Sequence, residues 1–137
     1  MAVLLDTSAI LALTNARDAH HEAVRVALGA LSEPLIVPLP VLPEVDYLVA
    51  RGVGPAGALA VVQSLVSGDI VIDHLAHADL ERATELMGIY ADAAIGFVDS
   101  TLIALAERLN CTRIATLDRR HFAFVRPRHC SQFEILP

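Results

Sequence analysis

Short apolar segments that alternate with helical patterns restrict the fold of this chain more than any other feature. Five such segments, each three to five residues long, lie at Ala2–Leu5, Leu35–Val37, Ile70–Ile72, Arg113–Leu117 and Phe133–Leu136. Apolar runs this short are typical of strands buried on both faces. Because helical patterns separate them, we expect an α/β fold with a mostly parallel sheet.

Apolar residues at helical spacing fill the segments between these strands. The expected helices are Thr7–Thr14, a segment capped by Asp18, Pro43–Gly52, Pro55–Gly68, Leu80–Ala94 and Val98–Leu109. No repeat, low-complexity tract or linker interrupts the alternation. We therefore expect residues 1–137 to form a single domain, which agrees with the usual size of about 100–200 residues.

The charged residues exclude several classes of protein. The chain has 10 basic residues, all arginine, against 16 acidic residues, and its net charge is −6. Without lysine, neither a phosphate-binding loop ending in Gly-Lys-Ser/Thr nor a Schiff-base enzyme is possible. A receiver domain, which normally carries an essential lysine, is disfavoured. A nucleic-acid partner would be repelled unless a bound cation offset the charge locally.

No segment of the sequence indicates a membrane or secreted protein. The longest apolar runs, Pro34–Pro43 and Val53–Val62, are broken by proline or glycine and are shorter than the ~18 residues that a spanning helix needs. No signal peptide is visible, so we expect a cytoplasmic protein with no membrane partner. Cys111 and Cys130 are too few for a disulfide framework.

Four acidic residues occupy apolar or strand-end positions: Asp6, Glu44, Asp99 and Asp118. Each has a structural explanation when taken alone. Asp6 and Asp99 precede expected helices and can act as N-caps, whereas Asp118 can serve in a turn. Glu44 lies near the start of a helix, where a negative charge is stabilised by the helix dipole.

A shared site explains the four acids better than four separate roles. Apolar neighbours tend to bring them into the interior or a cleft, where unpaired carboxylates are costly and no lysine can pair with them. Mg²⁺ or Mn²⁺ prefers such oxygen ligands and can activate water for hydrolysis of a phosphodiester. The sequence therefore predicts a metal-dependent phosphodiesterase.

Four motifs in order resemble those of the PIN domain. They are Asp-Thr-Ser after the first strand, a glutamate within an apolar helix, Val-Asp-Ser-Thr-Leu-Ile-Ala-Leu-Ala-Glu, and Thr-Leu-Asp-Arg-Arg-His-Phe. Their spacing is similar to that of VapC ribonuclease toxins from bacterial toxin–antitoxin pairs. The resemblance implies a three-layer fold with a parallel five-stranded sheet. It also implies Mg²⁺- or Mn²⁺-dependent cleavage of structured RNA such as tRNA or rRNA, a homodimer, and a small antitoxin that covers the active site.

The resemblance also implies roles for individual residues. Asp6, Glu44 and Asp99 match the metal-binding acids, and Asp118 matches a more variable fourth acid. The hydroxyl positions that support these acids are matched by Thr7, Ser8 and Thr116. From the sequence itself, Arg119 and Arg120 are candidates for binding substrate phosphate or for pairing with acids. Asp92 is expected on the solvated surface.

Two other functions remain open from the sequence. The chain can be a PIN-like binding module that has lost catalysis, although the presence of all four acids argues against this. It can also be a phosphatase with Asp6 as covalent nucleophile. That chemistry usually needs a second aspartate two residues later, where this chain has Ser8, and a lysine.

Overall fold

Five parallel strands form the centre of the computed structural model, which describes all residues from 1 to 137. The strands are β1 (Val3–Leu5), β2 (Leu35–Pro38), β3 (Val71–Asp73), β4 (Arg113–Ala115) and β5 (Glu134–Leu136). Their order in the sheet is β3-β2-β1-β4-β5, and every neighbouring pair is parallel. The expected α/β fold with a five-stranded parallel sheet is confirmed.

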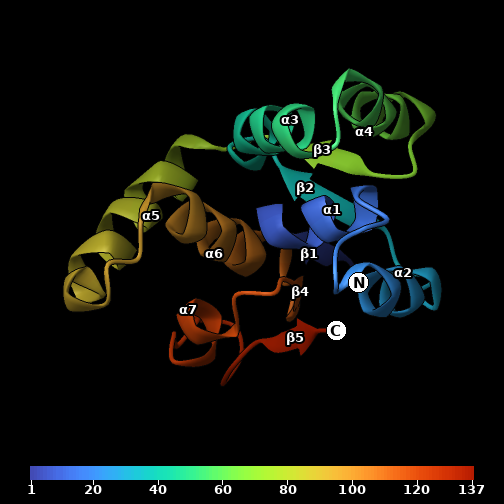
Figure 1. The fold of residues 1–137 in the computed structure, drawn as a ribbon. Coiled ribbons are helices and arrows are strands. Elements are labelled where there is room, and N and C mark those ends of the chain that lie inside the picture. The colour runs from blue at the N-terminus through green and yellow to red at the C-terminus, as the bar shows by residue number, and fades with distance from the viewer.

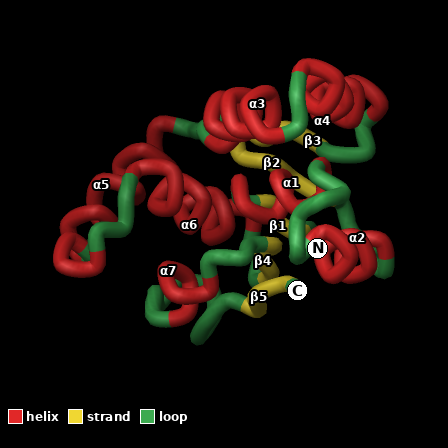
Figure 2. Tube along the Cα trace, in the orientation of Figure 1, coloured by secondary structure: helices red, strands yellow, loops and turns green.

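Helices flank this sheet and make up most of the chain (Figure 2). They are α1 (Thr7–Thr14), α2 (His21–Gly29), α3 (Val41–Gly52), α4 (Pro55–Ser67), α5 (His77–Ile89), α6 (Phe97–Leu109) and α7 (Arg119–Ala123), with a 3₁₀ turn at Ala91–Ala93. Figure 1 shows α3 and α4 beside the β3 end of the sheet and α7 beside the β5 end, while α5 and α6 pack against each other on one side. None of these helices combines the length and the hydropathy needed to cross a bilayer.

The central strand β1 anchors the hydrophobic core. Val3, Leu4 and Leu5 are fully buried, as expected for a strand covered by helices on both faces. In α6, the segment from Ser100 to Ala106 is buried throughout, so this helix lies deep in the molecule. Because β1 and β4 are in register with Leu5 opposite Ala115, the residues that follow the two strands emerge side by side.

Several helix boundaries predicted from the sequence are wrong. Asp18 does not cap α2; its Oδ1 accepts a hydrogen bond from the backbone N–H of His20 at 2.8 Å, and α2 begins at His21. The helix expected to run to Ala94 ends at Ile89, and Ala94 has a left-handed backbone with φ of 55°. The short helix α7 was not predicted, because five residues are too few to display a helical period.

A close contact between α4 and the end of α3 gives a test of the packing. A Cβ atom added at the buried Gly57 would lie 2.7 Å from Cγ1 and 2.9 Å from Cβ of Val53. We expect Gly57→Ala to lower the free energy of unfolding by about 1–2 kcal/mol through overpacking. Gly88→Ala is the matched control, because Gly88 lies in α5 with open space around its Cα. That change should raise the free energy by about 0.5–1 kcal/mol in urea denaturation. Equal effects of the two changes would contradict this account.

Candidate active site

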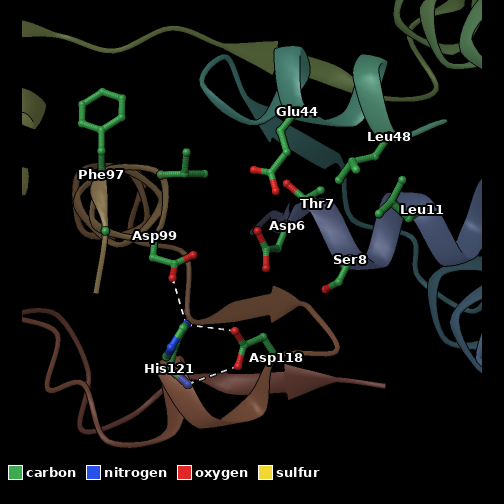
Figure 3. Close-up of a pocket in the computed structure, with 12 residues that line it drawn as sticks. Asp6, Thr7, Ser8, Leu11, Glu44, Leu48, Phe97, Asp99, Asp118 and His121 are labelled. Carbon is green, nitrogen blue, oxygen red and sulfur yellow. Dashed lines mark hydrogen bonds and ion pairs between the residues drawn. The ribbon is translucent and has the colours of Figure 1, made fainter. Parts of the chain in front are cut away.

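The four predicted acids line one pocket of about 500 Å³ at the carboxyl ends of β1 and β4. Asp6 directly follows β1, Glu44 lies in the first turn of α3, Asp99 in the first turn of α6, and Asp118 at the start of α7. Their carboxylates point into the same space from four different elements (Figure 3). In parallel α/β sheets, ligands bind at this edge.

Burial differs among the four acids. Asp6 is buried, Asp99 and Asp118 are partly buried, and Glu44 is exposed although it lines the pocket. The apolar neighbours of Glu44 in the sequence are buried on the other side of α3, where Val41, Val45 and Val49 pack in the core. The pocket is therefore an open cleft with one buried carboxylate at its base.

A chain of hydrogen bonds holds Asp6 in place. The Thr116 hydroxyl donates to Oδ2 of Asp6 at 2.8 Å. Because this uses the only proton of that hydroxyl, the Ser8 hydroxyl must donate to Thr116 Oγ1, 3.2 Å away. The Leu117 backbone N–H donates to Ser8 Oγ at 2.9 Å, and the Asp118 backbone N–H donates to Thr116 Oγ1 at 3.0 Å. Ser8 and Thr116 thus connect α1 to the loop that carries Asp118.

The helix-capping explanation fits only one of the three aspartates. Asp6 occupies the N-cap position of α1, but its side chain makes no capping hydrogen bond. Asp99 lies inside α6, whose N-cap is Gly96, so the N-cap prediction for Asp99 is wrong. Only Asp118 caps a helix, because its Oδ1 accepts from the His121 backbone N–H at a long 3.5 Å.

Burial and mutual repulsion favour the protonated form of two of these acids. Burial, together with the neighbouring Asp6 and Asp118 carboxylates, raises the pKa of Asp99 to about 6, despite the opposing effect of His121. Burial also raises the pKa of Asp6, while the hydrogen bond from Thr116 opposes that change. The site therefore concentrates negative charge that is stabilised incompletely by the protein itself.

His121 is a member of the site that the sequence did not reveal. Its Nδ1 lies 2.9 Å from Oδ2 of Asp118 and 3.1 Å from Oδ2 of Asp99, so the imidazole stands between the two carboxylates (Figure 3). The signal in the sequence was its position three residues after Asp118, which places both side chains on one face of a helical turn. Because α7 was not predicted, the three-residue spacing could not be interpreted as a shared helical face.

Three other residues considered from the sequence lie outside the pocket. No arginine is among its lining residues. The Arg119 guanidinium donates to the backbone carbonyl of Pro137, and Arg120 is exposed without a side-chain partner. Asp92 lies on the exposed 3₁₀ turn, as expected for a solvated residue.

The chemistry of the lining residues fits a hydrated magnesium or manganese ion. No three histidine, cysteine or acidic side chains are close enough to enclose a metal ion as they stand. Mg²⁺ does not need such a cage, since it usually keeps several waters and binds one or two carboxylates plus substrate phosphate. The Thr7 hydroxyl is buried without a hydrogen-bond partner and faces Glu44 in Figure 3. A metal-bound water would satisfy this hydroxyl.

Comparisons with known proteins agree with this architecture. The family model for the PIN domain matches residues 3–126. Ribonuclease VapC26 of Mycobacterium tuberculosis is 36% identical over 135 residues, which cover 98% of this chain and 100% of that protein. Among solved structures, VapC20 of M. tuberculosis, a sarcin-ricin loop cleaving toxin, superposes with a TM-score of 0.79 at 24% identity over 86% of this chain and 91% of that one. VapBC2 from Rickettsia felis, bound to a DNA fragment from its promoter, has a TM-score of 0.71 at 16% identity with full coverage of both chains.

The raised pKa of Asp99 makes a prediction about stability and pH in EDTA. The folded state binds this proton more tightly than the unfolded state, so ionisation of Asp99 lowers the free energy of unfolding. This loss of stability is absent below about pH 4, grows between pH 4 and 6, and is complete above pH 6. Asp99→Asn should therefore be more stable than wild type at pH 7.5, on the order of 1 kcal/mol because the carboxyl is partly exposed, and equal to it near pH 4.

Chemical denaturation of both proteins across this range measures the difference. Asp92→Asn removes the same charge from an exposed turn outside the pocket and serves as the control. A constant offset between wild type and Asp99→Asn at all pH values would show that Asp99 is not under electrostatic strain.

Proposed function

Because the chain belongs to the PIN-domain family and is homologous to VapC ribonucleases, we propose that it is an endoribonuclease dependent on Mg²⁺ or Mn²⁺ and the toxin of a toxin–antitoxin pair. Residues 1–137 act as one domain in this proposal. The main support for this proposal is that four carboxylates from four separate elements line one cleft. No arginine lines this cleft and only His121 approaches its carboxylates, so the chain itself does not neutralise them all.

We assign the metal-binding role to Asp6, Glu44 and Asp99, with Asp118 as the fourth acid. When bound, the metal supplies an activated water and neutralises charge on the scissile phosphate. Thr116 and Ser8 hold the Asp6 carboxylate in one orientation. His121 orients Asp99 and Asp118 through its Nδ1.

Structured RNA is the proposed substrate. The solved relative VapC20 is described as cleaving the sarcin-ricin loop. Phe, Tyr and Trp make up only 4% of this chain, and Phe97 and His121 carry the only rings that line the pocket. Recognition through RNA shape and backbone therefore fits better than a stacking platform for single strands.

A small antitoxin and a second copy of the chain are the proposed protein partners, and the cytoplasm is the proposed location. Several large apolar side chains are exposed, among them Val66 at 84%, Ile89 at 65% and Tyr47 at 63%. Exposed apolar surface on a short chain favours association with protein. Solved neighbours include VapBC complexes from Rickettsia felis and Salmonella typhimurium.

The two alternative functions have less support. A silent binding module does not need an orienting chain of hydrogen bonds behind a buried carboxylate. The phosphatase alternative needs a proton donor two residues after Asp6, but Ser8 at that position points into the hydrogen-bond chain with Thr116 and Leu117.

Cleavage of total RNA by variants tests the proposed roles. Asp6→Asn and Asp99→Asn should each abolish cleavage. We expect the cleavage rate to fall by about a hundredfold or more, which is typical when an electrostatic group is removed from an active site. Asp118→Asn should only reduce the rate, because Asn keeps a side-chain oxygen for the cap of α7. Discrete fragments that require Mg²⁺ or Mn²⁺ would support the assignment. An Asp118→Asn protein as inactive as Asp6→Asn would refute the proposed asymmetry.

Thermal melts test metal binding without relying on activity. Excess Mn²⁺ should stabilise wild type by mass action, by about 2–3 kcal/mol at a hundredfold excess over Kd. Asp6→Asn should respond much less, although in EDTA it should be more stable than wild type by about 1 kcal/mol because a repulsive charge is removed. Asp92→Asn should behave as wild type. Equal Mn²⁺ shifts in wild type and Asp6→Asn would remove Asp6 from the metal site.

A further inference from the structure

A second hollow extends the acidic pocket along the cleft between α1 and α3. Its volume is about 390 Å³, and it shares Leu11 and Leu48 with the acidic pocket. In Figure 3 these two leucines lie on the side of the pocket opposite Asp99 and His121. The two hollows are therefore neighbours that meet at these leucines, and we refer to them together as the groove.

Arg51 supplies the positive charge of this groove. The other residues that line the second hollow, besides the two leucines, are Asn15, Asp18, Gly52 and Val53. Arg51 is the only arginine that lines either hollow, and it is exposed and makes no ion pair or hydrogen bond. By contrast, Arg82, Arg108 and Arg113 are all paired with carboxylates.

The spacing along α3 connects Arg51 to the acidic pocket. Glu44, Leu48 and Arg51 are separated by four and three residues, so they lie along one face of the helix. Seven residues of helix span about 10 Å, which corresponds to about three steps of 3.4 Å along a stacked nucleic-acid strand. A strand with one phosphate at the carboxylates can therefore reach Arg51 with another.

We propose that the second hollow is a subsite for an RNA phosphate about three nucleotides from the scissile bond, and that Arg51 binds this phosphate. The inference rests on the proposed function, because it takes RNA as the substrate. Asn15 can add a donor, since its Oδ1 already accepts from the Arg17 backbone N–H at 3.0 Å and its amide NH₂ has no partner. Asp18, the acid in this hollow, accepts from the His20 N–H.

An acidic segment of a protein partner is the competing occupant for Arg51. Four carboxylates line the other end of the groove and, without a metal ion, repel an acidic peptide and a phosphate alike. A metal ion among those carboxylates would attract a phosphate instead. A nucleic-acid strand carries phosphates at regular intervals and so can satisfy both ends of the groove at once.

Binding of a fluorescein-labelled adenosine RNA of about 12 nucleotides, whose bases stack, tests the proposal when it is measured by anisotropy in Mg²⁺. The parent protein is Asp99→Asn, which should leave the probe intact. Adding Arg51→Gln should weaken binding about tenfold. It should also make the negative slope of log K against log salt shallower by about 0.7, the value for one phosphate contact on a single strand. Arg51→Lys should restore most of the affinity. A probe of about three nucleotides should bind equally to all variants, because it is too short to reach from the carboxylates to Arg51.

Arg25→Gln is the matched control, because it removes the same charge from the exposed surface of α2 and lines neither hollow. An unchanged affinity and salt slope in the Arg51→Gln protein would overturn the proposal. So would an equal loss in Arg25→Gln, which would indicate a general charge effect, or an absence of RNA binding by the parent. If binding depends on Arg51 but wild type does not cleave RNA, the subsite stands and the proposed nuclease function fails.

Discussion

The hydrogen bond from Thr116 to Asp6 is the interaction on which the geometry of the site depends. Thr116 and Asp6 are the first residues after β4 and β1, two adjacent strands held in register at the centre of the sheet. A single hydroxyl proton fixes the direction of every bond behind it, from the Leu117 N–H through Ser8 to Thr116. The same oxygen receives the Asp118 N–H and so sets the start of α7. A hydrophobic sheet thereby determines the orientation of a buried carboxylate and the position of a second one.

The distribution of arginine explains why the pocket remains acidic. The buried Asp79 carboxylate is paired with Arg108 at 3.0 Å, and the largely buried Glu107 is paired with Arg82 at 2.8 Å. These two buried acids outside the pocket are thus neutralised within the chain. In the pocket, only His121 approaches the carboxylates. The cleft therefore holds four acids and no arginine, and an external cation is the simplest way to balance their charge.

The fold could be predicted from the sequence because each buried strand and amphipathic helix carries its own periodic signal. The grouping of the four acids could also be predicted, since each follows a strand or lies near the start of a helix at the same edge of the sheet. His121 and Arg51 could not. His121 depends on a helix of five residues, too short for a visible period, and Arg51 depends on how α3 packs against α1. Asp18 was misassigned because an aspartate that binds a nearby backbone N–H resembles a helix cap in sequence.

The strand order has a consequence for synthesis of the protein. β1 is made first, yet it lies in the middle of the sheet, and its partner β4 comes more than a hundred residues later. Pairing over such a separation has a high cost in loop closure and forms slowly. A nascent chain that ends before Thr116 lacks both the donor to Asp6 and the fourth carboxylate. An incomplete chain on the ribosome therefore carries an unfinished site, and the cleft can form only when synthesis is nearly complete.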